Sequence, residues 1–515
     1  MGDQQDNIVL DPTLAAFAPD SDLKSLGVTH FIGIGGAGMS VLAEMLHEHG
    51  VNVQGSDRAA NAKTQHLQDA GVTVFVGQDA HNVEGADTVV YSSAIKPDNP
   101  EIVAAAERGA NIVHRSDILA LLMSQGRAVT VAGAHGKSTT SSLLAHILRT
   151  GGAGQLADPS YAIGASIQGP DGTTLDGGHA GAGDVLVAEA DESDGSFAKY
   201  RPTIAIITNA EADHLDHYGT AERYRAAFVD HAGHAVDHVI MCVDDEGARK
   251  VLRALDPRVA ERTIAYTTAT RSELGDLNGA MLVEISSEQE DRATGVERFV
   301  LDLPARLTGE ARVLPVELSI PGLHNARNAT AAIIAAILLG MDPDVAAQSA
   351  HSFLGAARRF QIRGQQDGVT VVDDYAHHPT EIAALLDATR RRYPDASIRV
   401  LFQPHLFSRT KFFAPQFAKA LDKADDVIVT GIFPAREKQE DFPDITAQTI
   451  VDEAKRLGDG DDWISAEEDM ALAAQMMAMR AESGDVILTV GAGDITKMAP
   501  VVLHALEARF SGNGQ

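Results

Sequence analysis

The sequence predicts an α/β protein built from three domains. The chain has 515 residues, more than one hydrophobic core usually supports and typical of about three domains. Strand-like apolar segments alternate with helix-like segments along most of it, a pattern that indicates parallel sheets covered by helices. Glycine-rich turns separate strand from helix near residues 33–38 and 133–136. We place the three domains at residues 1–125, 126–354 and 355–515.

The first domain is expected to be Rossmann-like. Its segment VTHFIGIGGAGMSVLAEMLHEHGVNVQGSD, residues 28–57, has the order strand, glycine turn, helix, strand. Further strands are expected in VTVFVG and DTVVYSSAI, and a strand followed by a helix in ANIVHRSDILALLM. This alternation is typical of a doubly wound sheet.

The second domain is expected to resemble a P-loop ATPase, and the third to be Rossmann-like again. Strands are predicted in AVTVAG, DVLVAEA, TIAIITN and HVIMCV, and the helix NARNATAAIIAAILLG closes the second domain. Gly- and Asp-rich stretches at 151–184 and around 275–295 are predicted to be surface loops. The third domain has strand patterns in VTVVDDYAHHP, SIRVLFQP, DDVIVTGIF and DVILTVGAG.

Composition narrows the classes of function. Acidic residues outnumber basic residues by 72 to 42, which gives a net charge of -30 and argues against non-specific nucleic-acid binding. Cys242 is the one cysteine, so no intrachain disulfide can form and a reducing compartment is indicated. No apolar run reaches the roughly 20 residues of a membrane helix, and the N-terminus lacks a signal-peptide pattern. We therefore expect a cytoplasmic protein with neither a membrane nor a nucleic-acid partner.

The first glycine motif is Gly33-x-Gly35-x-x-Gly38, followed at the end of the next strand by Asp57. In this arrangement the glycines let the backbone approach a pyrophosphate, and the acid can hold a ribose hydroxyl. The same physics suits NAD(P) and a UDP-sugar equally well. A tight turn without a ligand is the third possibility.

The second glycine motif, GAHGKST at residues 133–139, is a shortened phosphate-binding loop. The usual pattern G-x-x-x-x-G-K-[ST] requires glycine at position 131, where this chain has Val131. Backbone N–H groups of the loop and the following helix would still surround phosphate oxygens. Lys137 would reach the terminal phosphates, and Ser138 would offer a hydroxyl to Mg²⁺. ATP is the favoured ligand.

Two acidic clusters follow predicted strands of the second domain. The first, VAEADESDGSF, contains Glu189, Asp191, Glu192 and Asp194; the second, ITNAEADHLDHYG, contains Asn209, Asp213, His214 and Asp216. Alone, each cluster is better explained as solvated loop charge. Their position after parallel strands favours a magnesium site. Zinc is disfavoured, because DHLDH and DDYAHH lack the H-E-x-x-H spacing.

These motifs together resemble the Mur ligase family of cell-wall precursor enzymes. The family's short ATP loop aligns with Gly133 to Ser138, its metal-binding acid with Glu189, and its N-x-x-x-D-H-L-D segment with Asn209 to Asp216. PGLHNARNATAA matches the family's H-N-x-x-N signature, and RRFQ, VVDDYAHHPTE and FQPHLFSRT are similar to the branch that adds L-alanine. The resemblance covers nearly the whole chain.

The resemblance implies an ATP-dependent ligase of peptidoglycan precursor synthesis. ATP would phosphorylate the lactyl carboxylate of UDP-N-acetylmuramic acid, and the amine of L-alanine would attack the resulting acyl phosphate. ADP, phosphate and UDP-N-acetylmuramoyl-L-alanine would leave. A monomer or a homodimer is expected.

The resemblance also implies roles for individual residues. The catalytic residues would be Lys137, Glu189, His214 and Arg409. The metal ligands would be Ser138, Glu189 and His214. ATP would contact Gly133, Ala134, His135, Gly136, Lys137, Ser138, Thr139, His324, Asn325, Arg359 and Asp374. The UDP-sugar would contact Gly35, Gly36, Ala37, Gly38, Ser56, Asp57, Ser92, Ser93 and Arg115. The amino acid and the substrate carboxylate would contact Tyr375, His377, His405 and Arg409.

The chain departs from the family pattern at several places, and two other classes of function compete. Ala134 and Ser138 replace usual threonines of the ATP loop, with the hydroxyl kept at 138, and Leu406 replaces an arginine found in many members. An NAD(P)-dependent oxidoreductase would explain the first glycine motif but not GAHGKST. A module that only binds a UDP-sugar would leave Lys137, Glu189 and His214 without a role.

Overall fold

The computed structural model of the chain describes residues 8–18, 21–169, 173–291, 295–435, 437–457 and 463–511. Contacts divide the chain into two compact units. The first comprises Met1–Ser287, Phe299–Glu317 and Arg327–Phe353; the second comprises Glu288–Arg298, Leu318–Ala326 and Leu354–Gln515. The first unit contains two large sheets and a separate pair of short strands, so the domain boundary near residue 125 falls inside it and stays a prediction.

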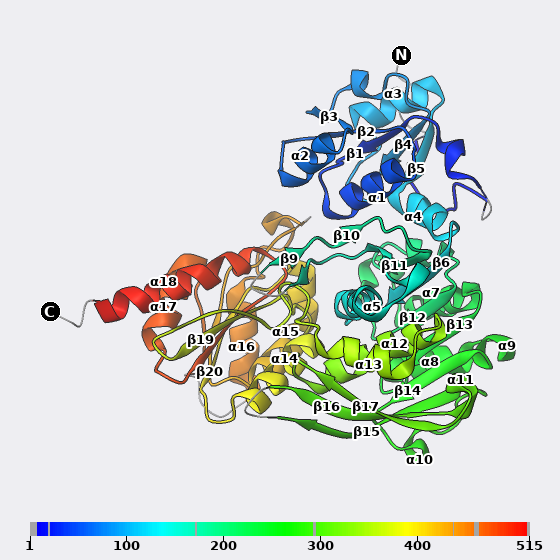
Figure 1. The fold of residues 1–515 in the computed structure, drawn as a ribbon. Coiled ribbons are helices and arrows are strands. Elements are labelled where there is room, and N and C mark those ends of the chain that lie inside the picture. The colour runs from blue at the N-terminus through cyan, green and yellow to red at the C-terminus, as the bar shows by residue number, and fades with distance from the viewer. Residues whose placement is uncertain are drawn as a thin grey trace. The chain divides into compact units, whose positions relative to one another are not determined.

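The first sheet of unit one is parallel and has the strand order β3-β2-β1-β4-β5 (Figure 1). Phe31 and Val90 pack with Leu42 of α1 on one face, whereas Ile32 and Val89 pack with α3 on the other. This alternation explains why helices cover both faces of the sheet. The strands are β1(Thr29–Ile32), β2(Val53–Asp57), β3(Thr73–Val76), β4(Thr88–Tyr91) and β5(Asn111–His114), and the helices are α1(Ala37–Glu48), α2(Ala62–Asp69), α3(Pro100–Arg108) and α4(Arg115–Met123).

The second sheet has ten strands in the order β10-β7-β11-β6-β12-β13-β14-β15-β16-β17. Its strands, with β8 and β9 of a separate pair, are β6(Arg127–Ala132), β7(Ser160–Ala162), β8(Ile167–Gln168), β9(Thr174–Leu175), β10(Gly178–His179), β11(Val185–Glu189), β12(Ile204–Ile207), β13(His238–Cys242), β14(Thr263–Thr267), β15(Met281–Glu290), β16(Glu297–Leu303) and β17(Arg312–Leu318). The helices of this part are α5(Lys137–Gly151), α6(Leu215–Tyr218), α7(Ala221–His234), α8(Glu246–Ala254), α9(Pro257–Ala260), α10(Arg271–Leu274), α11(Ala305–Thr308), α12(Leu323–Leu338) and α13(Pro343–His351).

The centre of this sheet brings three chain segments to one edge. β6 pairs in parallel with β11 and with β12, with Glu189 opposite Val131 and Ile207 opposite Ala132. Continuous apolar sequence in these strands is typical of parallel strands that are buried on both faces. Because parallel strands end at the same edge, the segments that follow residues 132, 189 and 207 start side by side.

The prediction of surface loops in the Gly- and Asp-rich stretches is wrong for parts of both. Met281–Glu290 forms β15, which pairs with β14 in parallel and lies between β14 and β16. β7 and β10 add two short strands at the opposite end of the sheet. The sequence did not reveal β15, because only its start is mainly apolar and a polar run from Ser286 to Glu290 follows, along an incompletely buried strand.

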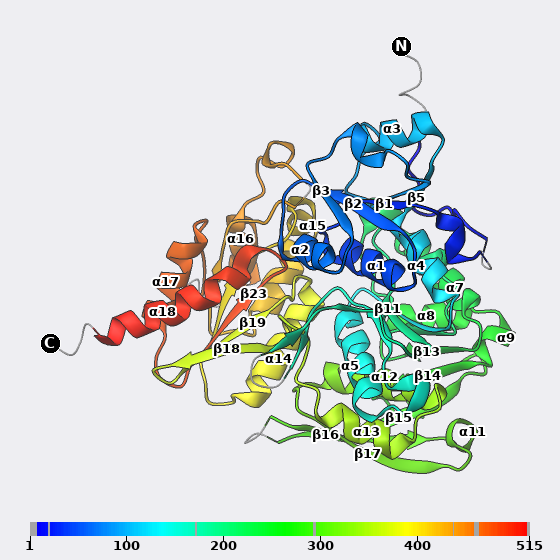
Figure 2. The same ribbon diagram turned by 45° about the horizontal axis from the view of Figure 1, so that its top comes forward.

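The sheet of unit two has the order β18-β19-β23-β20-β21-β22, antiparallel only at its β18–β19 pair among the pairs described. Helices α14, α15 and α16 pack with Val372 and Val400 on one face, and α17 and α18 pack with Val371 and Leu401 on the other (Figure 2). The strands are β18(Gln361–Gln366), β19(Val369–Asp374), β20(Ile398–Phe402), β21(Asp426–Val429), β22(Ile464–Ala466) and β23(Val486–Val490), and the helices are α14(Pro379–Arg392), α15(Phe407–Leu421), α16(Ala447–Leu457), α17(Met470–Arg480) and α18(Met498–Ser511).

Two predictions from composition can be compared with this fold. Cys242 lies at the end of β13, inside the predicted strand HVIMCV; it is buried, and burial raises the pKa of its thiol. Within the described residues, no helix combines the length and the apolar character that a bilayer span requires.

Candidate active site

The loop between β6 and α5 is built around two glycines with positive φ. Gly133 has φ 135° and Gly136, the N-cap of α5, has φ 84°. A Cβ atom at Gly133 would lie 2.2 Å from Thr208 Oγ1, and one at Gly136 would lie 2.7 Å from Asn328 Oδ1. Both the backbone conformation and the close packing therefore require glycine. The result is a compact turn that presents the N-terminus of α5, a favourable place for phosphate oxygens.

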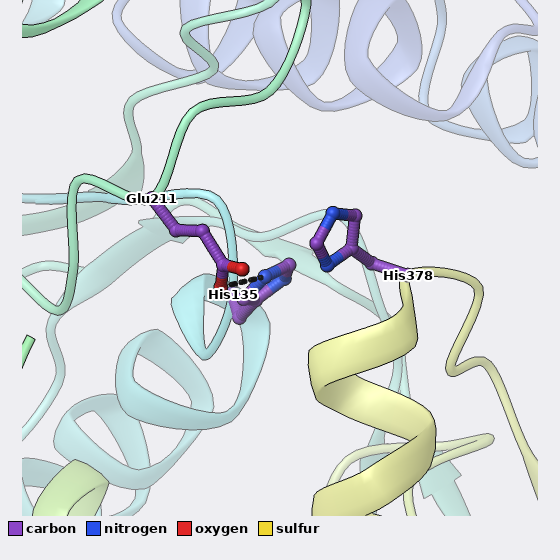
Figure 3. A group of neighbouring side chains, drawn as sticks. All are labelled: His135, Glu211 and His378. Atoms are coloured by element: carbon purple, nitrogen blue, oxygen red, sulfur yellow. Dashed lines mark hydrogen bonds and ion pairs between the residues drawn. The ribbon is translucent and has the colours of Figure 1, made fainter. Parts of the chain in front are cut away.

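The segment after β12 holds this loop in place. The His135 carbonyl accepts hydrogen bonds from Thr208 Oγ1 at 2.5 Å and from Asn209 Nδ2 at 2.9 Å. His135 Nε2 lies 3.2 Å from Glu211 Oε2, and Figure 3 shows the two side chains turned toward each other. Asn209, predicted from its motif alone, thus supports the loop through direct hydrogen bonds.

Lys137, the first residue of α5, folds back over the loop. Its Nζ donates to the Gly133 carbonyl at 2.6 Å and lies 2.9 and 3.0 Å from the two carboxylate oxygens of Glu192. The Glu192 side chain is fully buried, and burial raises its pKa to about 7, although the Lys137 ammonium opposes this shift. Burial also disfavours the charged form of Lys137 and so lowers its pKa. The neighbouring carboxylates, of which Glu192 has the largest effect, outweigh burial and hold the pKa of Lys137 above its usual value.

Three further side chains predicted at the metal site start from the same edge of the sheet. Glu189 ends β11, and its Oε1 accepts a hydrogen bond from the Gly164 N–H at 2.9 Å. Ser138 follows Lys137 in the first turn of α5. His214 precedes α6 with a left-handed backbone, φ 52°, and its Nε2 lies 3.8 Å from Glu192 Oε1. Hydroxyl and carboxylate oxygens are donors that suit Mg²⁺, and the imidazole is a less usual one.

The first glycine motif also forms a tight turn before a helix. Gly33 has φ 77°, and Gly36 is the N-cap of α1, which starts at Ala37. The Gly35 N–H donates to Asp57 Oδ2 at 2.9 Å, so the acid at the end of β2 supports the turn directly. A Cβ atom at Gly38 would lie 3.0 Å from Arg115 Nη1, which places a guanidinium beside the first turn of α1.

The predicted serines of this region lie in different surroundings. The Ser56 hydroxyl is fully buried and donates to Glu101 Oε2 at 2.6 Å. Ser92 follows β4 and is half-buried, and its neighbour Ser93 donates to Asp194 Oδ2 at 2.7 Å. Arg115 Nη2 lies 3.3 Å from Asp191 Oδ2. The acidic segment after β11 thus contacts residues of both glycine-motif regions within unit one.

The residues predicted to bind the amino acid and the substrate carboxylate all lie in unit two. The ring centroids of Tyr375 and His377 are 5.4 Å apart, and those of His377 and His405 are 5.9 Å apart. Arg409, on α15, is 9% exposed. Burial lowers the pKa of His377, and the nearby Arg409 charge acts in the same direction, whereas Glu381 opposes them. The buried Arg409 guanidinium near these rings is a group suited to bind a carboxylate.

Four residues predicted to contact the nucleotide also belong to this unit. The Asp374 carboxylate accepts hydrogen bonds from the Phe360 and Ala376 N–H groups, both at 2.7 Å. The Arg359 guanidinium carbon lies 5.3 Å from the centroid of the Tyr375 ring. His324 and Asn325 lie in the first turn of α12, where Asn325 Nδ2 donates to the Pro321 carbonyl at 2.7 Å.

Asp374 makes the stability of the protein depend on pH. Burial raises the pKa of its carboxyl to about 6 from an ordinary 3.8. Because the folded state binds the proton more tightly, the favourable contribution present below about pH 4 is lost as the pH rises through about 6. Two pKa units correspond to about 3 kcal/mol. We expect the unfolding free energy of Asp374→Asn to fall less than that of the wild type between about pH 4 and 7, by up to that amount.

Urea unfolding of both proteins across this pH range measures the difference in slope. Asp422→Asn, at an exposed position that follows α15, is the matched control and should keep the wild-type slope. Parallel curves for the wild type and Asp374→Asn would contradict the assignment.

The sequence prediction missed three residues that the structure places next to predicted ones. Glu192 binds Lys137, Asn328 packs against Gly136, and the Glu381 carboxylate accepts a hydrogen bond from the His377 N–H at 3.0 Å. Asn328 is the second asparagine of the H-N-x-x-N motif, and Glu192 belongs to an acidic cluster that was considered as a whole. The motif and the cluster were therefore available signals, but neither showed which side chain turns inward.

Comparison with sequence models identifies the family over three stretches of the chain. The Mur ligase family, catalytic domain, matches residues 28–127. The Mur ligase middle domain matches residues 131–336, and the Mur ligase, glutamate ligase domain, matches residues 358–493.

Individual relatives agree with these matches. A UDP-N-acetylmuramate--L-alanine ligase of Bifidobacterium adolescentis is 71% identical over 97% of both chains, and one of Bifidobacterium longum is 68% identical over 98% of both. The crystal structure of a UDP-N-acetylmuramate-alanine ligase from Thermotoga maritima superposes with a TM-score of 0.70, at 29% identity, over 94% of this chain and 99% of the other. The predicted three-domain α/β architecture is confirmed, and the chain belongs to the Mur ligase family.

Proposed function

We propose that this protein is an ATP-dependent ligase that joins L-alanine to the lactyl carboxylate of UDP-N-acetylmuramic acid. The observation that carries the proposal is its 71% identity, over 97% of both chains, to a protein named for that reaction. The compact loop with Lys137 at the start of α5 supports the use of ATP. An oxidoreductase would leave this loop without a role, so we set that alternative aside.

The reaction would proceed in two steps. A carboxylate oxygen of the substrate attacks the γ-phosphorus of ATP, the bond to the β-phosphate oxygen breaks, and ADP leaves. The alanine amine then attacks the acyl carbon, loses a proton, and displaces inorganic phosphate. Negative charge gathers on the phosphoryl oxygens in the first step, and the Lys137 ammonium is placed to neutralise it.

Mg²⁺ would supply further charge neutralisation at these oxygens. Ser138, Glu189 and His214 are the residues that we propose to hold it. Loop residues Gly133 to Thr139, with His324, Asn325, Arg359 and Asp374, are proposed to bind ATP. Bound substrate must also be kept from water, because an acyl phosphate hydrolyses readily.

The remaining predicted residues are assigned to the other two substrates. We propose that Gly35 to Gly38, Ser56, Asp57, Ser92, Ser93 and Arg115 bind the UDP-sugar. Tyr375, His377, His405 and Arg409 are proposed to bind the amino acid and the substrate carboxylate. The domain boundaries at 125 and 354, a cytoplasmic location and a monomeric or homodimeric state belong to the same proposal.

The substrate dependence of phosphate release tests the proposed function. The purified protein is incubated with ATP and Mg²⁺, with and without UDP-N-acetylmuramic acid and L-alanine. Sustained release that requires both substrates, with a product of the mass of UDP-N-acetylmuramoyl-L-alanine, is the expected result. Release that is indifferent to both substrates, or no release in any combination, would contradict the proposal.

Arg409→Ala should weaken the binding of L-alanine selectively. Losing a charged hydrogen bond to the amino-acid carboxylate costs about 1.5–3 kcal/mol, so we expect the KM for L-alanine to rise about tenfold to a hundredfold. The KM for ATP should stay within about threefold of the wild-type value. Initial rates at varied L-alanine and varied ATP measure both constants.

Lys411→Ala is the matched control, because Lys411 is an exposed cation on the same helix. It should leave the KM for L-alanine unchanged. An equal rise in the KM for every substrate of Arg409→Ala would show that the site is generally disturbed and that Arg409 has no selective role.

A further inference from the structure

We propose that Glu192 is a positioning residue that fixes the Lys137 ammonium at the phosphate loop before ATP binds. The inference rests on the proposed function, which gives Lys137 its task. Glu192 lies in the short segment between β11 and the 3-10 helix Ser196–Lys199, three residues beyond the predicted metal-binding acid Glu189. Its side chain is fully buried and lies against Lys137.

Three oxygen atoms surround the ammonium. The Gly133 carbonyl is 2.6 Å from Lys137 Nζ, and Glu192 Oε1 and Oε2 are 2.9 and 3.0 Å from it. An ammonium has three N–H groups, so this set can engage all of them. A lysine side chain has four flexible torsions, and three short contacts restrict them to one arrangement.

The protein holds the Glu192 backbone as well. The Tyr218 hydroxyl donates to the Glu192 carbonyl at 2.6 Å, from the C-terminal end of α6. Because the carboxylate is completely shielded from solvent, it cannot turn outward to exchange Lys137 for water. Glu192 therefore acts as a fixed anchor for the ammonium.

The other acids of the same segment have different partners. Asp191 lies 3.3 Å from Arg115, Asp194 accepts from Ser93, and Glu189 accepts from the Gly164 N–H. The ammonium is thus held chiefly by Glu192. A charged group stabilises a transition state most when it is already in position and need not move during the reaction. Glu192 would hold the Lys137 ammonium in such a position.

Steady-state kinetics of Glu192→Gln and Glu192→Asp test this role. Glutamine keeps the size of the side chain but not its charge, so we expect kcat to fall at least about tenfold while the KM for ATP changes less than about threefold. Aspartate keeps the charge on a shorter side chain and should recover part of the lost kcat. Glu246→Gln, at an exposed position of α8, is the control and should behave like the wild type.

A kcat of Glu192→Gln within about twofold of the wild-type value would overturn the inference. A variant in which only the KM for ATP changes would also overturn it. So would a kcat of Glu192→Asp that is no higher than that of Glu192→Gln. If the wild type itself shows no ligation, the proposed function has failed, and the inference is then decided by the stability of the pair, which needs no substrate.

Thermal unfolding of a double-mutant cycle supplies that second measurement. Lys137→Ala leaves the buried carboxylate without its ammonium, so adding Glu192→Gln to this variant should raise Tm by about 3 °C or more. In the wild-type background the same Glu192→Gln change should lower Tm, because it leaves the Lys137 ammonium without the negative charge of Glu192. Equal shifts of the same sign in both backgrounds would show that the two residues are not coupled and would overturn the inference.

Discussion

Lys137→Ala is expected to release phosphate at least about a thousandfold more slowly than the wild type under saturating substrates. The variant removes the ammonium that the structure holds 2.6 Å from the Gly133 carbonyl, at the start of α5. The backbone of the loop remains, so the KM for ATP should change far less than kcat. A coupled assay for phosphate at varied ATP measures both constants.

Lys250→Ala provides the matched control, because Lys250 is an exposed lysine in unit one that pairs with Glu246 along α8. Its rate should equal that of the wild type. If Lys137→Ala kept more than about a tenth of the wild-type kcat, the loop would not be acting on the transferred phosphoryl group.

His214→Ala is expected to lower kcat about a hundredfold and to raise the Mg²⁺ concentration needed for half-maximal rate. His214 has a left-handed backbone, which is unusual for a residue other than glycine and is typical of functional sites. Its ring lies beside Glu192 and Asp213, where a cation would be favoured. Rates at varied Mg²⁺ and fixed, saturating ATP measure the effect.

His217→Ala controls for the general effect of losing an imidazole from this segment. His217 is exposed and lies on α6, just after His214. Its variant should keep the wild-type Mg²⁺ dependence. A His214→Ala enzyme with normal Mg²⁺ dependence would contradict the proposed metal role, even if its kcat were reduced.

Most of the fold could be predicted because its strands are short and apolar and end in glycine turns. β1 and β6 were located by the glycines that follow them, and β19 by the run VTVVDD before a tyrosine. β15 could not be predicted, because the polar run from Ser286 to Glu290 carries a weak strand signal. Sheet order depends on long-range pairing, such as that of β6 with β11 and β12, which a single sequence does not specify.

The spacing of motif residues in the sequence predicted one part of the candidate site, the phosphate-binding loop, but not which acid contacts Lys137. GAHGKST placed Lys137 immediately before a helix, and in the structure it is the first residue of α5. Glu189 ends β11 and three more acids follow within five residues, and their spacing alone does not distinguish the four. In the turn after the strand, Glu192 is buried against Lys137, whereas Asp191 pairs with Arg115. Packing decides this arrangement, because Tyr218 and His214 from a later segment also contact Glu192.

The measurement that tests the central claim most directly follows an oxygen atom from substrate to product. UDP-N-acetylmuramic acid labelled with ¹⁸O in its lactyl carboxylate is incubated with ATP, Mg²⁺ and L-alanine, and the released phosphate is analysed by mass spectrometry. If an acyl phosphate forms, the carboxylate oxygen that attacked phosphorus leaves with the phosphate, so each phosphate formed from doubly labelled substrate carries one ¹⁸O atom. Unlabelled phosphate formed alongside the alanine product would contradict the account.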